Sequence, residues 1–277
     1  METVRELLHR GSDLPTGSGR RDAEILLSHC LGKTRAWLYT WPEREVPVHC
    51  ARQFAQLLAR RREGLPVAYL TGEREFWSLS LEVNSDTLIP RPETETLVAW
   101  ALELALPVEA EVLDLGTGSG AIALAVASER PGWQVTGIDI SAEALQVARA
   151  NAHKTGLRRV SFLQSDWFSA VAGRRFHLLL SNPPYIDVDD PHLSQGDLRF
   201  EPRSALVSPG GGMADLEHLV AGAAANLLDG GWLLLEHGFE QADAVRKLLR
   251  AGGFDRIGTR SDLAGLERVS GGCWHAD

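Results

Sequence analysis

Cysteine is scarce in this chain of 277 residues, which has three: Cys30, Cys50 and Cys273. Their odd number and wide separation predict neither a disulfide framework nor a zinc site. The nine histidines do not follow metal-ligand spacing either. We therefore expect a reducing compartment and no bound metal.

Long hydrophobic runs are also lacking. The longest nearly apolar stretch, Leu219 to Leu228, is too short to cross the hydrocarbon core of a bilayer. Residues 1–11 mix charged and apolar side chains at helical spacing and lack the apolar core of a signal peptide. These absences predict a cytoplasmic protein that does not bind membranes.

Basic residues are in deficit, because 28 Lys and Arg stand against 37 Asp and Glu and give a formal net charge of -9. A surface that grips nucleic-acid phosphates needs clustered Lys and Arg. The clusters Arg20-Arg21 and Arg60-Arg61-Arg62 each adjoin an acidic residue, which is typical of a solvated helix face. The composition favours a protein or small-molecule partner over direct binding of nucleic acid.

The spacing of apolar residues divides the chain into three parts. From Val4 to about Arg62 they recur at helical spacing, which predicts a small helical domain over residues 1–72. The alternation from Phe76 to Val83 is typical of a strand with one buried face, within a hairpin linker over 73–92. Residues 93–277 are long enough to form a larger domain with its own core.

Short apolar strands alternate with amphipathic helices in this larger domain. Such an order builds a parallel sheet that helices cover on both faces, so the fold class is α/β. The last two strands have no helix between them and predict an antiparallel hairpin at the edge of the sheet. The predicted strands span Glu111–Leu115, Gln134–Ile138, Val160–Leu163, Phe176–Leu180, Gly231–Glu236, Asp255–Thr259 and Glu267–Cys273. The predicted helices include Ala121–Glu129, Ala142–Lys154, Leu216–Leu228 and Gln241–Arg250.

A glycine-rich turn follows the first predicted strand of this domain. Glycines at such a turn let a ligand approach the backbone closely. The second strand ends at Asp139, about 20 residues further on, where a carboxylate can accept both ribose hydroxyls of a nucleoside. The predicted cofactor-binding residues here are Gly116, Thr117, Gly118, Ser119, Gly120 and Asp139. This pattern indicates a nucleoside cofactor but does not identify which one, and it comes close to the fingerprint of nicotinamide cofactors. A tight strand-helix turn without a ligand is the remaining alternative.

The fourth predicted strand runs into Asn182, Pro183, Pro184 and Tyr185. Each proline fixes its own φ and disfavours the helical region for the residue before it, so Asn182 is held extended. Its side-chain oxygen and the carbonyl of Pro183 can then accept hydrogen bonds from one amino group, while the ring of Tyr185 offers a face for stacking. This arrangement suits an amide or an exocyclic amine. The alternative is an ordinary turn.

Asp166 and Trp167 follow the third strand and discriminate between cofactors. Because ligands of open parallel sheets bind beyond the carboxyl ends of the strands, these residues should meet Asn182 in one crevice. Asp166 can hold an adenine amino group with Trp167 packed beside it, although Trp167 is also compatible with an ordinary core position. Hydride transfer gives no role to the segment after Asn182, whereas methyl transfer from S-adenosylmethionine does. We therefore predict this cofactor, with S-adenosylhomocysteine as its product.

These motifs, taken together, resemble the HemK/PrmC family of release-factor glutamine N5-methyltransferases. The matching segments of the larger domain are Asp114–Gly120, Gly137–Asp139, Ser165–Phe168 and Ser181–Ile186. Further matches are Pro66–Gly72 with Glu75–Trp77, Ile89–Glu95 and Arg199–Pro202. The resemblance covers nearly the whole chain. Asn-Pro-Pro-Tyr is shared with DNA and RNA methyltransferases, whereas the segment Ile89–Glu95 is much more specific.

The resemblance implies a Rossmann-like class I methyltransferase domain and a helical N-terminal domain that contacts the substrate protein. The implied reaction methylates the side-chain nitrogen N5 of the glutamine in the Gly-Gly-Gln motif of peptide chain release factors. Asn182, Pro183 and Tyr185 are the expected catalytic residues. Pro184 joins them in binding the substrate, and Asn182 also touches the cofactor. The alternatives are glutamine methylation of a ribosomal protein, N-methylation of DNA or RNA bases, and a non-catalytic module that binds S-adenosylmethionine.

Overall fold

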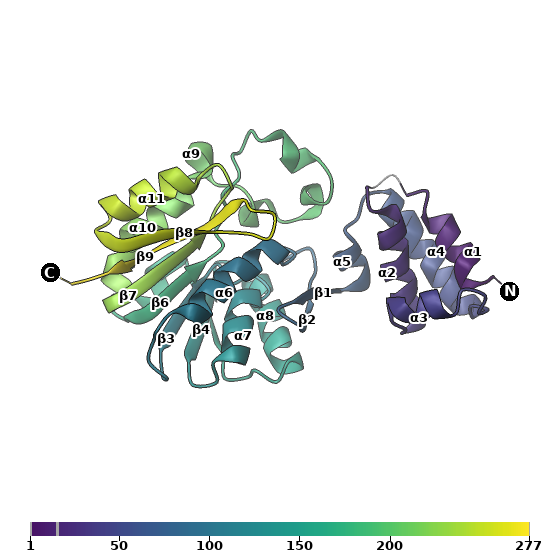
Figure 1. The fold of residues 1–277 in the computed structure, drawn as a ribbon, viewed down its shortest axis with the longest axis horizontal. Helices are drawn as coiled ribbons and strands as arrows, with labels where there is room; N and C mark the ends of the chain where they lie inside the picture. Colours follow the sequence, from purple (N-terminus) through teal and green to yellow (C-terminus); the bar gives the residue numbers. More distant parts are fainter. Residues whose placement is uncertain (1, 15–16, 277) are drawn as a thin grey trace. The chain divides into compact units, whose positions relative to one another are not determined.

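The computed structural model describes residues 2–14 and 17–276, and the chain folds as two compact units (Figure 1). The first comprises Met1–Glu73 with His192–Phe200, and the second comprises Arg74–Pro191 with Glu201–Asp277. Residues 1 and 277, the outer limits of the predicted domains, lie outside the described part. The predicted limits 1–72, 73–92 and 93–277 stay predictions, and they leave residues 192–200 with the larger domain.

Helices form the first unit, as the apolar spacing predicts. They are α1 (Val4–Gly11), α2 (Gly19–Leu31), α3 (Arg35–Thr40), α4 (Val48–Arg62) and α5 (Val67–Thr71). Their apolar faces enclose a core that includes the fully buried side chains of Leu7, Leu27 and Phe54. Thr3 and Glu6 form a capping box at the start of α1, which satisfies N–H groups that a helix start leaves unpaired.

Residues 192–200 join this unit through Arg61 in α4. Its guanidinium pairs with Asp22 Oδ2 and with Asp197 Oδ1, each at 2.8 Å. It also donates to two backbone carbonyls. The Arg61 side chain is 7% exposed, so these partners compensate for the removal of its charge from water.

A seven-stranded sheet forms the second unit, in the order β5-β4-β3-β6-β7-β9-β8. The strands are β3 (Glu111–Leu115), β4 (Gln134–Asp139), β5 (Ser161–Gln164), β6 (Phe176–Ser181), β7 (Leu227–Glu236), β8 (Phe254–Ser261) and β9 (Glu267–Trp274). The pairs from β5 to β7 are parallel, while β9 is antiparallel to both β7 and β8. The predicted α/β sheet with an antiparallel edge hairpin is confirmed.

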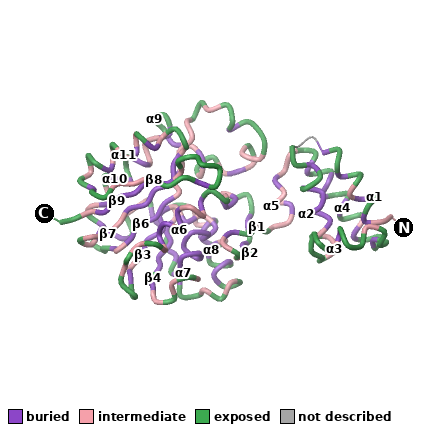
Figure 2. The backbone as a smooth tube through the Cα atoms, viewed as in Figure 1, coloured by how far each residue is buried: buried purple, intermediate pink, exposed green. Residues whose placement is uncertain are grey.

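Alternate residues of the central strands face two separate cores. Val112 of β3 packs with α6 (Glu95–Glu103), α7 (Ala121–Glu129) and α8 (Ala142–Lys154), whereas Leu113 packs with α10 (Ala214–Asn226) and α11 (Ala242–Ala251). Figure 2 shows the strands buried between these helical layers. Because both faces are covered, consecutive residues of a central strand can be apolar, as Leu178, Leu179 and Leu180 of β6 are, and all three are fully buried.

The linker contains a small hairpin of β1 (Glu73–Phe76) and β2 (Leu79–Glu82). The expectation of one continuous strand from Phe76 to Val83 is wrong. Trp77 and Ser78 have φ of 50° and 61° and turn the chain back, as in a type I′ turn. Such turns favour Asn and Gly, so Trp-Ser gives little local signal for one.

Short helices complete the described chain. They are η1 (Pro92–Thr94), η2 (Trp167–Val171), η3 (Pro191–Ser194), η4 (Leu198–Phe200), η5 (Arg203–Ala205) and α9 (Pro209–Gly212). Within residues 2–14 and 17–276, no helix has both the length and the apolar character needed to span a membrane.

Candidate functional site

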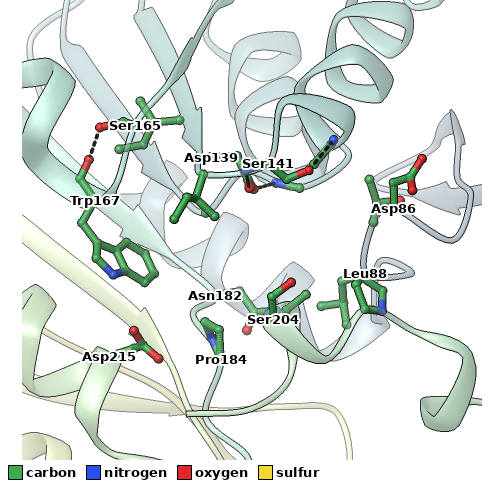
Figure 3. Close-up of a pocket in the computed structure, with 18 of the residues that line it drawn as sticks. Asp86, Leu88, Asp139, Ser141, Ser165, Trp167, Asn182, Pro184, Ser204 and Asp215 are labelled. Atoms are coloured by element: carbon green, nitrogen blue, oxygen red, sulfur yellow. Dashed lines mark hydrogen bonds between the residues drawn. The ribbon is translucent and has the colours of Figure 1, made fainter. Parts of the chain in front are cut away.

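A cavity of ≈ 270 Å³ lies at the carboxyl ends of β3, β4, β5 and β6 (Figure 3). This is the edge at which open parallel sheets bind ligands. The predicted residues in its wall are Gly116, Gly118, Asp139, Asp166, Trp167, Asn182 and Pro184. The fold therefore brings four separate loops together. Thr117, Ser119, Gly120, Pro183 and Tyr185, although described, lie behind or beside the wall.

The glycine-rich loop has a backbone that requires glycine. Gly116, Gly118 and Gly120 have φ of 73°, 55° and 82°, in the left-handed region that side chains disfavour. A Cβ placed on Gly118 would have no described atom within 4 Å, so this part of the loop borders open space. A ligand can therefore come close to the backbone there.

Asp114, in β3, fixes the shape of this loop through hydrogen bonds. It is fully buried, and its Oδ2 accepts hydrogen bonds from Thr117 Oγ1 at 2.6 Å and from the N–H of Ala123 at 3.2 Å. Burial raises the pKa of Asp114 to about 7, although both of these hydrogen bonds lower it. Thr117 thus acts on the loop's frame in this structure, and its predicted contact with a cofactor stays a prediction.

Asp139 is held in one orientation at the end of β4. The N–H of Gly118 donates to Oδ2 and the N–H of Ser141 donates to Oδ1, each at 2.9 Å. Burial raises the pKa of Asp139, while these hydrogen bonds lower it. Each carboxylate oxygen keeps a further lone pair, so the side chain retains acceptors for a pair of hydroxyls.

Trp167 forms one wall of the cavity and packs on the core. Its φ is 43°, and its carbonyl accepts a hydrogen bond from Ser165 Oγ at 2.5 Å. A Cβ on Gly116 would lie 3.7 Å from the Trp167 ring, so the ring rests against the glycine loop. On another side the ring centroid is 6.4 Å from that of His218. The core position and the cavity position, predicted as alternatives, occur together.

Asn182 reaches the cavity from the end of β6. Ser181 Oγ donates to the carbonyl of Leu115 at 2.6 Å and so ties β6 to β3 just before the turn. Asn182 Nδ2 donates to Thr94 Oγ1 at 3.2 Å. With its nitrogen engaged, the amide offers Oδ1 to a ligand. Figure 3 shows Asn182 beside Pro184 and Ser204.

Tyr185 lies deeper than the predicted stacking role suggests. Its hydroxyl donates to Glu236 Oε1 at 3.3 Å, and its ring packs on the core shared with α10 and α11. Burial, and then the charge of Glu236, raises its pKa above the ordinary value. Its stacking and catalytic roles, like those of Pro183, stay predictions.

Comparison with known proteins places these features in one family. Residues 4–72 match the PrmC N-terminal domain, and residues 94–213 match the methyltransferase small domain. A release factor glutamine methyltransferase of Pseudomonas aeruginosa is 53% identical over 99% of each chain. The chain belongs to the release factor glutamine methyltransferase family. Family members from Vibrio cholerae (52% identical over 96% of this chain and 92% of theirs) and Escherichia coli (48% identical over 93% of each) agree. The predicted family membership is confirmed.

Solved structures support the fold. A methyltransferase from Pyrococcus furiosus superposes with a TM-score of 0.56 at 16% identity, and the match covers 80% of this chain and 100% of that structure's chain. The hMettl16 catalytic domain, solved in complex with MAT2A 3′UTR hairpin 1, gives 0.59 at 14% identity over 82% and 81% of the chains. The predicted class I methyltransferase fold is confirmed, and the family's domain composition agrees with it.

Two further segments of the cavity wall in this family member were not predicted from the sequence. They are Asp86–Leu88 before η1 and the stretch around η5 that includes Pro202, Ser204 and Ala205. Each segment adjoins a motif that the sequence analysis did identify, Ile89–Glu95 in one case and Arg199–Pro202 in the other. Glu201 joins these motifs, because it accepts the N–H of Ile89 at 3.0 Å and pairs with Arg91. One buried carboxylate thus joins two motifs that are far apart in the sequence.

A separate group of potential metal ligands lies at the opposite edge of the sheet. Ligand atoms of Asp255, Cys273 and His275 lie within 4.8 Å of one another. Asp255 and Cys273 are paired across β8 and β9, so sequence spacing gives no hint of this proximity. The expectation of no bound metal stays a prediction.

Proposed function

We propose that this chain transfers a methyl group from S-adenosylmethionine to the side-chain nitrogen N5 of glutamine in the Gly-Gly-Gln motif of peptide chain release factors. The observation that carries the proposal is that the fixed carboxylate of Asp139 and the amide of Asn182 border one cavity. The carboxylate of Asp139 suits the hydroxyls of a ribose, and the amide of Asn182 suits a planar substrate amide. Membership of the release factor glutamine methyltransferase family supports the choice of substrate.

The donor set fits the proposed cofactor. Asp139 would accept the ribose hydroxyls, Gly116 and Gly118 would allow close approach to the backbone, and Asp166 with Trp167 would hold the adenine. When bound, the sulfonium supplies an electrophilic methyl group. The protein's task is then to place a nucleophile in line with it.

Asn182 performs the main chemical task in this proposal. A glutamine amide is a poor nucleophile because its nitrogen lone pair is delocalised into the carbonyl. Asn182 Oδ1 and the carbonyl of Pro183 accept the two N–H groups of the substrate and so fix the nitrogen. The same acceptors stabilise the positive charge that grows on this nitrogen during transfer. Positioning at about 3 Å then supplies much of the acceleration, and a proton leaves after attack.

The composition fits a protein substrate in the cytoplasm. The net charge of -9 argues against a nucleic-acid groove. We assign to the helical unit the remaining contacts with the release factor, because a short loop alone offers little binding energy for positioning. The free thiols of Cys30, Cys50 and Cys273 fit a reducing cytoplasm.

Intact release factor tests the assignment. The protein is incubated with labelled S-adenosylmethionine and either a Gly-Gly-Gln or a Gly-Gly-Ala release factor, and tryptic peptides are analysed by mass spectrometry. We expect one methyl group on the glutamine and none on the alanine variant. A ribosomal protein and an RNA serve as competing substrates. Efficient methylation of either one, with the release factor unmodified, would overturn the substrate assignment and leave the fold assignment intact.

A further inference from the structure

The edge hairpin of β8 and β9 gathers three different metal-ligand side chains outside the cavity. Asp255 in β8 and Cys273 in β9 are directly paired across the two antiparallel strands. Opposite residues of such a pair have side chains on the same face of the sheet. His275 follows just after the end of β9, two positions from Cys273, and side chains two positions apart along a strand share a face. The hairpin therefore brings oxygen, sulfur and nitrogen donors together, all within 4.8 Å of one another.

The ligand atoms have nearly the spacing of a tetrahedral metal site. Cys273 Sγ lies 3.5 Å from His275 Nε2, and this nitrogen lies 3.7 Å from Asp255 Oδ2. A tetrahedral zinc ion, with bonds of about 2.3 Å to sulfur and about 2.0 Å to nitrogen, holds those two atoms about 3.5 Å apart. The carboxylate must come slightly closer to complete the site. Its side chain is 57% exposed, which leaves room for this movement.

Asp229 of β7 orients the imidazole of His275. Its Oδ1 lies 3.2 Å from His275 Nδ1 and also accepts the N–H of Ala276 at 3.1 Å. With a proton on Nδ1, the ring presents the lone pair of Nε2 to Cys273 and Asp255. A carboxylate on the far nitrogen of a histidine is the usual companion of a protein metal site, because it fixes the tautomer and makes the ligand more basic.

The charges around the cluster favour a cation. Besides His275, the charged groups that act on Cys273 are Asp255, Asp229 and Arg256. Two carboxylates thus stand against one guanidinium. Three electron-pair donors converge, and the thiol offers a single proton to separate them. A divalent ion at their centre would replace that proton and offset the negative charge.

We propose that Asp255, Cys273 and His275 bind a divalent ion of the zinc class, with water as the fourth ligand. Thiolate and imidazole donors select such an ion over magnesium or calcium, which prefer oxygen ligands. The thiol releases its proton to water when the ion binds. The exposed sides of His275 and Asp255, 45% and 57%, give the ion and its water a route from solvent.

The bound ion would cross-link the end of the chain to the sheet. It would join β8 to the segment after β9, and through Asp229 it would also hold β7. Because β7 runs parallel to β6, Asp229 near its start lies at the edge opposite the carboxyl ends that border the cavity. The site is therefore independent of the proposed methyl transfer. Its occupation would overturn the expectation, from the sequence, of no bound metal.

Cobalt spectroscopy tests the ligand set. Untagged full-length protein is stripped of metal with a chelator and titrated with Co²⁺, which accepts the same ligands and absorbs light. We expect one Co²⁺ per chain, with a thiolate charge-transfer band in the near ultraviolet. An equivalent of Zn²⁺ should remove the band, because zinc binds such sites more tightly than cobalt does. Cys273→Ser should abolish the band, and His275→Gln should weaken binding of the ion.

Cys50 provides the matched control. Its Sγ also lies near a histidine nitrogen, 3.3 Å from His49 Nε2, but within residues 2–14 and 17–276 this pair belongs to no group of three potential ligands. Cys50→Ser should therefore keep the band at full intensity. A band that survives in Cys273→Ser would overturn the proposal. So would a wild type without the band, in which the cluster would be held only by ion pairs of a protonated His275.

Substitution of Asp229 tests the orientation of the imidazole. Asp229→Asn keeps the shape and removes the charge, and it should lower the affinity for Zn²⁺ about 10- to 100-fold while the cobalt band persists at saturation. Asp243→Asn, at an exposed position on α11, is the control and should bind Zn²⁺ as the wild type does. Equal affinities of the two variants would overturn the role assigned to Asp229.

Urea unfolding tests the cross-link. Zn²⁺ should raise the unfolding midpoint of the second unit, because an ion that binds only the folded protein stabilises it. The rise should be lost in Cys273→Ser and also in His275→Gln, which alters a half-exposed side chain and so serves if the buried Cys273 position does not tolerate serine. A wild-type midpoint that ignores Zn²⁺ would defeat the cross-linking role.

An activity measurement separates this site from the proposed function. The rate of methyl transfer should be the same for metal-free and zinc-loaded protein, since the ion lies away from the cavity. If the protein binds Co²⁺ as described but methylates no release factor, only the proposed function fails. Methyl transfer that requires the ion would contradict its purely structural role.

Discussion

The N–H of Gly118 donates to Asp139 Oδ2 at 2.9 Å and so joins the glycine-rich loop to the end of the neighbouring strand. The loop leaves space beside Gly118, and the carboxylate borders the same cavity. Together with the hydrogen bond from the Thr117 N–H to the Ile138 carbonyl at 2.8 Å, this contact holds the two parts of the proposed nucleoside site next to each other. A change in the carboxylate therefore affects both the acceptor and the loop.

Asp139→Ala should weaken binding of S-adenosylmethionine. In the proposed site the ribose hydroxyls would lose a charged acceptor, and loss of hydrogen bonds to a charged group costs about 1.5–3 kcal/mol. Titration calorimetry on the folded variant measures this change. Asp243→Ala, at an exposed position on α11, is the control and should bind as the wild type does. Equal affinities of the two variants would remove Asp139 from the cofactor site.

Asn182→Ala should lower turnover far more than cofactor affinity. In the proposed mechanism the side chain binds chiefly the substrate amide and the charge that develops in the transition state, and loss of one such partner commonly costs about 10²–10³ in rate. Single-turnover methylation of release factor gives the rate, and calorimetry gives the cofactor affinity.

A second asparagine controls for a purely structural effect of that change. Asn226→Ala removes a buried amide from α10, whose Nδ2 donates to the carbonyl of Gly222 at 2.8 Å, and it should keep the rate per folded molecule. If Asn182→Ala behaves in the same way, with lower stability but normal turnover, Asn182 serves the turn alone.

Local patterns in the sequence were sufficient for the sheet and for much of the cavity. Apolar strands, intervening helices and the glycine turn are signals within a few residues, and the carboxyl-edge rule then brings Asp139, Asp166 and Asn182 together. Long-range contacts had no such signal. Glu236 has the sequence pattern of an ordinary polar end to a strand, and only the fold buries it next to Tyr185.

Sequence patterns did not indicate that residues 192–200 associate with the helical unit, for the same physical reason. Their association with the helical unit depends on Asp197 meeting Arg61, which is 136 positions away in the sequence. Nothing in the polar composition of this stretch distinguishes it from a surface loop. The ion pair between Arg61 and Asp197 can be tested directly by mutation.

Arg61→Met should destabilise the helical unit by about 3–5 kcal/mol, because it removes the cation that pairs with the buried Asp22 carboxylate at 2.8 Å. Asp197→Asn should cost only about 0–1 kcal/mol, since the Asp197 side chain is 42% exposed. Urea unfolding followed by fluorescence of the tryptophans in α3 and beside it, Trp37 and Trp41, reports this unit.

Limited proteolysis distinguishes the two Arg61 contacts. Asp197→Asn should speed cleavage within residues 192–200 while the helices stay resistant. Arg61→Met should speed cleavage both within residues 192–200 and within the helices. Equal stability of Arg61→Met and the wild type would mean that this ion pair does not hold the unit together.

Asp114 should make stability fall as pH rises from about 4 to about 7. Its ordinary pKa of 3.8 is raised to about 7 in the folded protein, chiefly by burial. Between these values the folded state binds more protons than the unfolded state, and stability then decreases with pH. Below the unfolded pKa the contribution is fully present, and above the folded pKa it is lost.

Asp114→Asn isolates this effect because an amide of the same shape does not titrate. Urea unfolding of the second unit between pH 4 and 8 should show a shallower decline for the variant than for the wild type. Glu236, whose pKa burial also raises to about 7, and Asp139, whose pKa burial raises as well, contribute to the remaining decline, so the Asp114→Asn/Glu236→Gln pair should be flatter still. Thr117 keeps a polar partner in Asp114→Asn, so the glycine loop should retain its shape. Parallel curves for the wild type and Asp114→Asn would show that Asp114 is ionised throughout this range, and that the loop is built around a charged rather than a neutral carboxyl.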